Sequence, residues 1–481
     1  MNKIDEKGVT VKKDKDFSDW YTQVIIKSNF ADYSTVSGCM ILRPSAYNVW
    51  EKIKDIVDKK IKELGVKNTY FPLFIPESLL AKESTHLKGF TPEVAWVTEV
   101  GNTKLNERLA VRPTSEAIMY DSFSKWIKSW RDLPLKLNQW NSVVRWEFKH
   151  PIPFLRTREF LWNEGHTAFA TKAEAEKETK DILNLWKEVT QDYMALYGVK
   201  SKKTEKEKFA GAEYTIALEF LLPNGKSIQG PDVHHDDQIF AKAYNIKFLD
   251  KDEKTKYVYQ NTWAITTRMI GVMVAIHSDD KGLVIPPKLC ENKVVIVPIL
   301  FEKDKKIIFK KSNELKKQLE EFNPILDDRE EYTPGWKFNE WELKGIPIRI
   351  EIGPKDIKNK QIIIVRRDTG KKEIIKISKN INKNIEKILN DIQKNLFDKS
   401  KKFFNDNKVM VKTFDELLNV IKNKKLVETF WCGNTECEDW IKDKTNGAKI
   451  IGIPLKQPKK VEKCVYCKKQ GKHIAYIAKS Y

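Results

Sequence analysis

The segment Arg145-Trp-Glu-Phe-Lys-His-Pro-Ile-Pro-Phe-Leu-Arg156-Thr-Arg158 concentrates arginine in a chain that otherwise relies on lysine. Of the 87 Lys+Arg residues in the 481-residue sequence only 12 are arginine, yet three of these lie within fourteen positions. Lysine suffices wherever a diffuse positive charge is needed, whereas the planar guanidinium group binds carboxylate or phosphate through two parallel hydrogen bonds. We therefore expect the active site in this segment.

Period-two alternation around this segment predicts an antiparallel hairpin. Val144, Trp146 and Phe148 would lie on one face of the first strand, and Arg145 and Glu147 on the other. The return strand would place six side chains on one face, those of Arg156, Arg158, Phe160, Trp162, Glu164 and His166. A solvated hairpin with ordinary cross-strand ion pairs would alternate in the same way. Such solvated faces rarely combine aromatic rings with several guanidinium groups, which favours a binding surface.

Two motifs place polar groups where a strand is followed by a helix. Arg112-Pro-Thr-Ser-Glu116 offers Thr114 or Ser115 as an N-cap, and capping alone could explain both residues. Asn261-Thr-Trp-Ala-Ile-Thr-Thr-Arg268 puts an arginine in the first turn of the following helix, where the helix dipole disfavours a cation. A nucleotide phosphate beside Arg268 would remove that penalty. A close approach to the helix is expected at Gly271, which has no side chain.

Length and composition bound the remaining possibilities. A chain of this length predicts roughly three domains of ~150 residues each. The formal charge of +20 suggests a polyanionic partner such as nucleic acid, although the general lysine bias could account for part of it. The N-terminus lacks the apolar core of a secretory signal, and no stretch reaches the ~18 apolar residues of a membrane span. With six dispersed cysteines, the sequence predicts a cytoplasmic protein without a membrane partner.

Three regions follow one another along the chain. Residues 1–287 combine helices at about 46–64 and 171–198, the second opened by a capping box, with strands at 69–76, 108–112 and 257–265, which predicts an α+β domain. Residues 288–399 alternate strands at 293–298, 346–352 and 361–365 with helices at about 304–321 and 380–396, which predicts an α/β domain. Residues 400–481 form a third domain, preceded by a lysine-rich linker at about 398–408.

Four cysteines of the third region have the spacing of a structural metal site. Cys432 and Cys437 form a Cys-x4-Cys pair, and Cys464 and Cys467 form a Cys-x2-Cys pair. This spacing is typical of Zn²⁺, and four thiolates leave no open position for chemistry. Disulfides are the alternative, which a reducing compartment disfavours.

The motifs together resemble class II aminoacyl-tRNA synthetases, and specifically the prolyl-tRNA synthetase family. The resemblance rests on residues 112–116, 143–169, 206–211, 266–268 and 334–349. It implies an antiparallel catalytic sheet, an α/β anticodon-binding domain, a zinc-binding α/β C-terminal domain and a homodimer. It also implies ATP-dependent, Mg²⁺-assisted activation of proline to prolyl-adenylate and pyrophosphate, followed by transfer to the 3′ end of tRNA(Pro).

The resemblance assigns roles residue by residue. Catalysis falls to Arg145, Arg268 and Glu116. The proline site comprises Thr114, Glu116, Arg145, Trp162, Glu164, His166 and His234. The ATP site comprises Arg145, Glu147, Arg156, Phe160, Gln229, Thr266 and Arg268. Anticodon reading falls to Glu342, Arg349, Lys355 and Lys371, since guanine edges favour Arg or Lys donors with a carboxylate acceptor. Without the resemblance, each of these four could belong to a solvated charged surface.

Departures from the family pattern and rival functions define what must be tested. Pro231-Asp232-Val233 stands where the family commonly has a small residue, then Thr-Ser, and Ala264 stands where glycine is usual. The short interval from Arg158 to Arg268 resembles the archaeal and eukaryotic form, which lacks an inserted editing domain. A tRNA-binding paralogue without activity and a threonine-specific enzyme are the alternatives. The terminal Tyr481 is expected near the active site.

Overall fold

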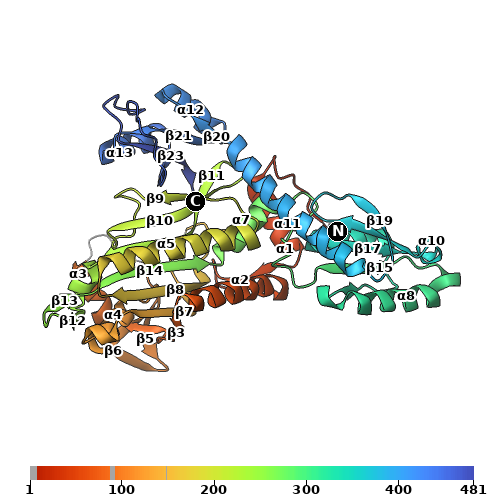
Figure 1. Ribbon diagram of the computed structural model, residues 1–481, viewed down its shortest axis with the longest axis horizontal. Coiled ribbons are helices and arrows are strands. Elements are labelled where there is room, and N and C mark those ends of the chain that lie inside the picture. The colour runs from red at the N-terminus through yellow and green to blue at the C-terminus, as the bar shows by residue number, and fades with distance from the viewer. Residues whose placement is uncertain (1–7, 87–92, 148) are drawn as a thin grey trace.

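The computed structural model describes residues 8–86, 93–147 and 149–481. In the first region an antiparallel sheet is surrounded by helices (Figure 1). Its elements are α1 (Phe17–Lys27), β1 (Ala31–Tyr33), β2 (Met40–Leu42), α2 (Pro44–Glu63), β3 (Lys67–Asn68), β4 (Phe74–Pro76), α3 (Glu77–His86), β5 (Trp96–Val100), β6 (Thr103–Val111), α4 (Glu116–Trp126), β7 (Leu135–Val144), β8 (Glu159–Phe169), α5 (Lys172–Glu188), the π-helix η2 (Val189–Tyr193), β9 (Val199–Lys202), β10 (Tyr214–Leu221), β11 (Lys226–Asp237), α6 (Ile239–Ala243), β12 (Lys247–Leu249), β13 (Thr255–Tyr257), β14 (Tyr259–Thr266) and α7 (Arg268–His277).

The central strands run in the order β9-β10-β11-β14-β8-β7, and every neighbouring pair is antiparallel. Register brings residues distant in sequence into one row. His166 of β8 pairs with Thr262 of β14, which pairs in turn with His234 of β11. One row along, Glu164 pairs with Ala264, which pairs with Asp232. The sheet therefore brings together Glu164, His166 and His234 of the predicted proline site from two strands, β8 and β11.

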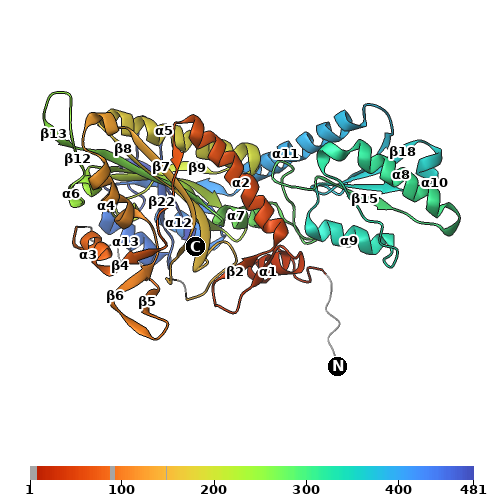
Figure 2. The ribbon, with the colours of Figure 1, turned by 90° about the horizontal axis from the view of Figure 1, so that it is seen from below.

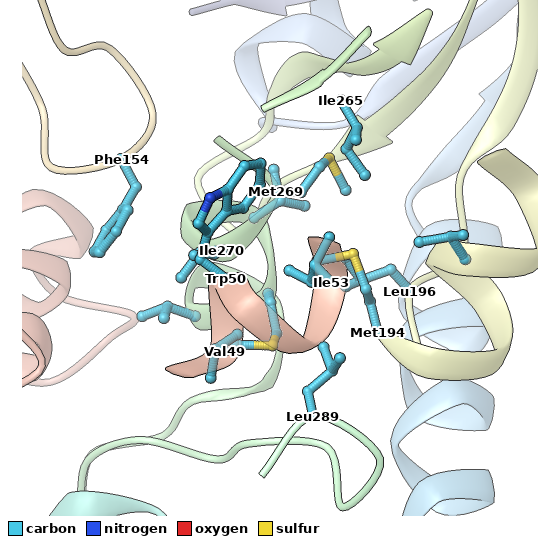
Figure 3. Close-up of a cluster of buried hydrophobic side chains, with 14 of the residues drawn as sticks. Val49, Trp50, Ile53, Phe154, Met194, Leu196, Ile265, Met269, Ile270 and Leu289 are labelled. Carbon is cyan, nitrogen blue, oxygen red and sulfur yellow. The ribbon is translucent and has the colours of Figure 1, made fainter. Parts of the chain in front are cut away.

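The helices pack an apolar core against the sheet. Figure 3 shows Val49, Trp50 and Ile53 of α2 facing Met269 and Ile270 of α7. The predicted helix over 46–64 is confirmed. The helix predicted over 171–198 opens with both hydrogen bonds of its capping box, but helical structure ends at Tyr193, before the predicted end. Gly271 is closely approached as expected, because a Cβ there would lie 2.7 Å from the side chains of Leu155 and Tyr21.

The predicted hairpin is present, but its first strand ends earlier than expected and its return strand begins later, at Glu159, so Arg156 and Arg158 lie in the connection. β7 and β8 pair from Leu135↔Ala168 to Val144↔Glu159, and the connection between them spans residues 145–158. The strand extension through Trp146 is wrong, because its N–H donates to Glu93 O (2.9 Å) and leaves the hairpin. The predicted position of Phe148 lies outside the described residues. Of the strand predicted over 69–76, only β4 (Phe74–Pro76) is found, and the short β3 (Lys67–Asn68) precedes the predicted range.

The second region is an α/β body built on a five-stranded sheet of order β16-β15-β17-β18-β19. Its elements are β15 (Val294–Pro298), α8 (Lys305–Gln318), β16 (Ile325–Leu326), α9 (Pro334–Lys344), β17 (Ile348–Ile352), α10 (Pro354–Lys358), β18 (Gln361–Arg366), β19 (Lys372–Lys376) and α11 (Ile381–Asp406). Each predicted strand begins and ends within a few residues of its prediction, as does the helix predicted at 304–321, whereas the helix predicted at 380–396 continues ten residues further, to Asp406. α11 then runs back toward the first region (Figure 2).

The linker predicted at 398–408 is wrong, because α11 continues to Asp406. Its buried face extends through Leu396, Ser400 and Phe404, spaced four residues apart, with the Ser400 hydroxyl accepting a hydrogen bond from Tyr197 N–H (2.9 Å). Lys394–Asp398 and Lys402–Asp406 ion pairs lie on the exposed face. A lysine-rich composition thus concealed an amphipathic helix.

The third region extends the sheet of the first. Its elements are β20 (Lys408–Met410), α12 (Phe414–Lys422), β21 (Leu426–Trp431), α13 (Thr435–Lys444), β22 (Lys449–Pro454) and β23 (His473–Ser480). β22 pairs with β9 and β23 pairs with β11, which yields one continuous eleven-stranded sheet. Across the described residues, no helix has the length and apolar character that spanning a membrane requires.

Candidate active site

A cavity of about 330 Å³ opens on one face of the central sheet. Its walls come from the start of α4, the β7–β8 connection, β8, β11, β14 and the start of α7. The predicted proline and ATP residues that line it are Thr114, Glu116, Arg145, Glu147, Phe160, Trp162, Glu164, His166, Gln229, His234, Thr266 and Arg268. Arg156 is not among the lining residues, although its charge acts on Arg268.

The start of α4 presents Thr114 and Glu116 to the cavity. Thr114 Oγ1 donates a hydrogen bond to Glu116 Oε2, and both side chains are buried. Ser115 occupies the N-cap position, but its side chain makes no capping bond. Its hydroxyl and its backbone N–H both donate to Glu164. The predicted cap residue therefore does not cap α4. It connects the N-terminus of α4 to Glu164 through hydrogen bonds.

Glu164 lies at the centre of a buried hydrogen-bond network. Its Oε1 accepts from Asn141 Nδ2 (2.6 Å) and Gln139 Nε2 (3.1 Å), and its Oε2 lies 3.2 Å from His166 Nε2. Burial would raise the pKa of Glu164, but the hydrogen bond and charge of His166, together with Ser115 and Asn141, lower it to about 2. The carboxylate is thus ionised at neutral pH. It fixes the floor of the cavity.

His234 is held in a different environment from Glu164. Its Nδ1 lies 2.8 Å from Thr215 Oγ1, and the ring of Phe209 lies 4.8 Å away, centroid to centroid. Burial lowers the pKa of His234, against the opposing charges of Asp232 and Glu116. The imidazole is therefore neutral at pH 7, which suits a wall of a pocket for a small apolar ring.

Two arginines frame the cavity. Arg145 Nε donates to Pro113 O (2.9 Å), and its guanidinium lies 5.3 Å from the ring of Trp162 and 5.6 Å from that of Phe160. Arg268 donates to Leu155 O and Gln229 O, both at 3.2 Å. Burial, followed by the like charges of Arg145 and Arg156, lowers the pKa of Arg268, which remains a cation. Closely spaced, partly desolvated cations favour an anionic ligand.

Several lining or supporting residues were not singled out from the sequence. Gln139 and Asn141 alternate along β7 and hold Glu164, a period-two signal available in the sequence. Phe209, which packs against His234, lies in the 206–211 segment of the resemblance but received no role, and Thr215, which contacts His234 Nδ1, had no local signal. Asp232, the departure from the family pattern, accepts from Gln229 Nε2 (2.6 Å) and lies 3.6 Å from His234 Nε2. It is therefore tied to its neighbours within the cavity wall.

Comparison with known proteins accounts for the whole chain. Residues 96–277 match the family model of the tRNA synthetase class II core domain (G, H, P, S and T), residues 293–387 that of an anticodon binding domain, and residues 414–481 that of the prolyl-tRNA synthetase C-terminal domain. The proline–tRNA ligase of Natranaerobius thermophilus is 45% identical over 100% of both chains. The chain belongs to the prolyl-tRNA synthetase family.

Other relatives extend the same similarity. The proline–tRNA ligase of Alkaliphilus oremlandii is 47% identical over 97% of this chain and 96% of its own length. The bifunctional glutamate/proline–tRNA ligase of Mus musculus is 45% identical over 98% of this chain, which corresponds to 33% of the mouse protein. The similarity to this family thus includes the anticodon and C-terminal regions as well as the class II core.

The four cysteines of the third region converge as their spacing indicated. Cys432 Sγ lies 3.6 Å from Cys437 Sγ and 3.7 Å from Cys467 Sγ, and all four sulfurs, including that of Cys464, lie within 4.8 Å of one another. All four are free thiols, because a disulfide requires ~2.05 Å between sulfurs. The cluster could hold a metal ion.

The anticodon residues predicted from the family resemblance fall into two groups. Arg349 is buried on β17 and donates to Glu342 Oε1 (3.1 Å) and Glu351 Oε1 (3.0 Å). A solvated charged strand does not describe this ion-paired group. Lys355 and Lys371 are exposed, and the ammonium of Lys371 lies 3.1 Å from Glu373. Within the described part of the chain, neither lysine forms a hydrogen bond or an ion pair with Arg349.

Proposed function

We propose that this prolyl-tRNA synthetase family member is an active proline–tRNA ligase. It forms prolyl-adenylate and pyrophosphate from proline and ATP, and then transfers proline to the 3′ end of tRNA(Pro). The convergence of Glu116, Arg145 and Arg268 on one cavity supports this function, together with the similarity of the full chain to proline–tRNA ligases. A paralogue that only bound tRNA would have no need to retain these charged groups in a shared cavity.

The proline half of the site is assigned to the end of the cavity near α4. Glu116 provides the negative charge for the protonated imino group, and Thr114 provides an oxygen acceptor. Trp162, His166 and His234 enclose the ring, and the ionised Glu164 keeps Ser115 and His166 in position. The buried Glu116 carboxylate, with Thr114, matches the cationic imino group of proline. The aromatic rings of Trp162, His166 and His234 match its methylene groups.

The ATP half is assigned to the arginine side of the cavity. Phe160 and Arg268 hold the two faces of adenine, the second by a cation–π contact. Glu147, Gln229 and Thr266 bind the remainder of the nucleoside, and Arg156 binds the outer phosphates. ATP would bring Mg²⁺, for which the carboxylate oxygens of the cavity wall, among them Glu147, are suitable ligands.

Arg145 links the two halves. Its guanidinium would contact the proline carboxylate and the α-phosphate, so that a carboxylate oxygen attacks phosphorus and pyrophosphate departs. Fixed positive charge stabilises the pentacovalent transition state, and the bound geometry replaces a bimolecular encounter. No protein nucleophile is needed. In the second step the terminal ribose hydroxyl of tRNA attacks the prolyl carbonyl and AMP departs.

The second region is assigned to anticodon reading. Arg349, aligned by Glu342, would donate to the guanine bases of the proline anticodon, and Lys355 and Lys371 would contact the same loop. Base binding must then replace part of the ion pairing of Arg349 described above.

The cysteine cluster is assigned to structural Zn²⁺. Sulfurs at ~2.3 Å from a tetrahedral zinc ion lie about 3.8 Å apart, close to the 3.6 and 3.7 Å separations observed. The donor set of Cys432, Cys437, Cys464 and Cys467 therefore fits the ion. The site would hold the third region together and take no part in the reaction.

A cytoplasmic homodimer completes the proposal. The family resemblance implies the dimer. Exposed Tyr70, Phe74 and Trp126 give the first region apolar surface that a second copy could bury. The absence of disulfides among the six described cysteines is consistent with a reducing compartment.

ATP–pyrophosphate exchange with a panel of amino acids tests the function. Exchange should depend on proline, and the protein should then attach proline to tRNA(Pro). Threonine-dependent exchange would favour the threonine enzyme, whose catalytic pocket contains a metal. Neither metal-capable cluster found among the described residues lies in this cavity. Absence of exchange with any amino acid would favour the inactive paralogue.

A further inference from the structure

A second group of metal-ligating side chains lies on the face of β11 opposite the cavity. Successive residues of a strand point to opposite faces, so His234 faces the cavity and His235 faces α5. There His235, Asp237 and Glu213 place one ligand atom each within 4.8 Å of one another. Glu213 immediately precedes β10, and its N–H donates to His235 O (2.8 Å), which fixes the backbone of the group.

The imidazole of His235 is fully buried, and its Nε2 atom lies on the side of the two carboxylates. Its Nδ1 lies 2.8 Å from Asn261 Oδ1. The Asn261 amide is oriented by its other end, where Nδ2 donates to Ala175 O (2.8 Å) and Glu178 Oε2 (3.0 Å). Because an amide oxygen only accepts, Nδ1 carries the proton of this hydrogen bond. Nε2 is then the ring nitrogen available to a metal ion.

No hydrogen-bond partner for that Nε2 is found among the described residues. The Glu213 Oε2 atom lies 3.7 Å away, too far for a hydrogen bond. Buried polar atoms in folded proteins almost always have a partner. A neutral imidazole whose other nitrogen is fixed by a polar side chain is the usual arrangement of a metal-ligating histidine.

Charge around the group favours a cation. Lys172 bridges the two carboxylates, with its Nζ 2.9 Å from Glu213 Oε2 and 2.8 Å from Asp237 Oδ2. Two carboxylates and one ammonium leave a net formal charge of −1. The Lys172 side chain is 40% exposed and can rotate away into solvent, and the 45% exposed Glu213 side chain leaves a path of entry. The site is thus accessible without opening the fold.

We propose that Glu213, His235 and Asp237 form a second metal site, which binds a divalent transition ion of the Zn²⁺ class. One imidazole and two carboxylates are ligands that suit such ions, and at ~2.0–2.2 Å from the metal they need only small side-chain adjustments. The ion would join the start of β10 to the end of β11, and would displace Lys172. The site is independent of the proposed activity, since it lies across the sheet from the cavity.

Metal content of the full-length protein tests the site. Protein purified without chelator, supplied with Zn²⁺ and dialysed, should retain two zinc ions per chain, one at the cysteines and one here. Asp237→Asn and Glu213→Gln should each retain one. Asp237 has a φ of +50°, which asparagine tolerates, and Glu213 is exposed, so both variants should fold. Glu205→Gln, which alters an exposed Lys208 ion pair without an imidazole, is the matched control and should retain two.

Cobalt distinguishes the two sites within one molecule. Co²⁺ at the cysteines gives strong sulfur-to-metal absorption, whereas Co²⁺ at Glu213, His235 and Asp237 adds only weak bands, and Asp237→Asn should abolish those weak bands alone. Lys172→Met should tighten binding at the second site by about fivefold, the effect of one unit charge ~4 Å away in water. Equal zinc content in wild type, Asp237→Asn and Glu213→Gln would overturn the proposal. So would a second zinc ion lost with the cysteines.

Discussion

At the scale of single residues, Glu164 shows how a buried charge is made stable. Five donors or charges act on one carboxylate that has almost no exposure, and their combined effect outweighs the cost of burial. Removing one partner of such a network leaves the others unsatisfied. Glu164 therefore contributes to stability as well as to the shape of the proposed proline pocket.

The low pKa of Glu164 predicts a pH dependence of stability. Because the folded-state pKa of about 2 lies below the ordinary 4.5, the unfolded chain binds the proton more readily. The stabilisation is complete above pH 4.5, is lost as the pH falls toward 2, and amounts to about 3 kcal/mol in full. The difference in unfolding free energy between wild type and Glu164→Gln, measured by urea titration, should shrink between pH 6 and 3.5. A pH-independent difference would contradict this reasoning. Glu205→Gln serves as the exposed control.

Arg145 gives the sharpest test of the proposed chemistry. Lysine retains its charge but lacks the planar fork that would span a carboxylate and a phosphate. Arg145→Lys should lower kcat/KM for proline-dependent ATP–pyrophosphate exchange by about 10²-fold or more, the usual effect of losing one transition-state donor. Arg131→Lys is the control, because that arginine stacks on Trp130 away from the cavity and should have little effect. A change below threefold for Arg145→Lys would exclude the bridging role.

About half of the cavity-lining residues, 12 of 25, could be predicted, some from local signals and the others through the family resemblance. Arginine scarcity marked Arg145, and period-two alternation in β8 identified Phe160, Trp162, Glu164 and His166. Residues that support them through space gave no such signal. Ser115 appeared to be a helix cap, since nothing near it in sequence reveals that Glu164 lies across the sheet.

At the scale of elements, α11 shows where composition misleads. Lysine and aspartate dominate residues 398–406, yet a buried stripe of every fourth residue persists beneath them. The period of apolar residues, rather than the abundance of charge, determines whether a segment is helix or linker. The predicted length of the first hairpin strand is wrong for a related reason. Alternation continues beyond Val144, but Trp146 finds its hydrogen-bond partner in another segment.

A core substitution in α11 tests whether the segment is a packed helix. Phe404 is buried with Leu221, Leu426 and Tyr476, between the first and third regions. Phe404→Ala should lower the free energy of unfolding by about 3–5 kcal/mol and speed tryptic cleavage within 398–408. Lys402→Ala, on the exposed face, should change it by less than about 0.5 kcal/mol. Rapid cleavage of the wild type in this segment would restore the linker interpretation.

At the scale of the whole molecule, the continuous sheet couples the third region to the catalytic one. β22 and β23 pair with β9 and β11, and Tyr481 N–H donates to Ser227 O (3.2 Å). The terminus therefore lies at the start of β11, whose residues from Gln229 onward line the cavity, while Tyr481 itself is not among the lining residues. Destabilising the third region should therefore also destabilise the strands of the first region that pair with it.

Removal of the cysteine-bound metal tests that coupling. Structural zinc can contribute ~10 kcal/mol or more to a small domain. Chelation, or Cys437→Ser, should raise hydrogen exchange across β21–β23, with a smaller rise in β9 at their junction. Cys290→Ser, which alters a buried thiol outside the cluster, should not change exchange in the third region. Unchanged exchange after verified metal loss would show that the cluster is dispensable for stability.

The size of the proposed proline pocket sets a limit on its selectivity. A smaller amino acid such as alanine fits any pocket built for proline and loses only methylene packing, worth ~1–3 kcal/mol, or roughly 10–200-fold in rate. Hydrolytic correction would need a second site, yet residues 158–268 are fully described and form only the strands and helices of the catalytic region. We expect alanine to support slow exchange, and we expect pure protein to leave alanyl-tRNA(Pro) intact over the time in which it charges proline. The measurement is deacylation of preformed alanyl-tRNA(Pro), with prolyl-tRNA(Pro) as control. Rapid, alanine-selective deacylation would require a correcting site elsewhere in the fold.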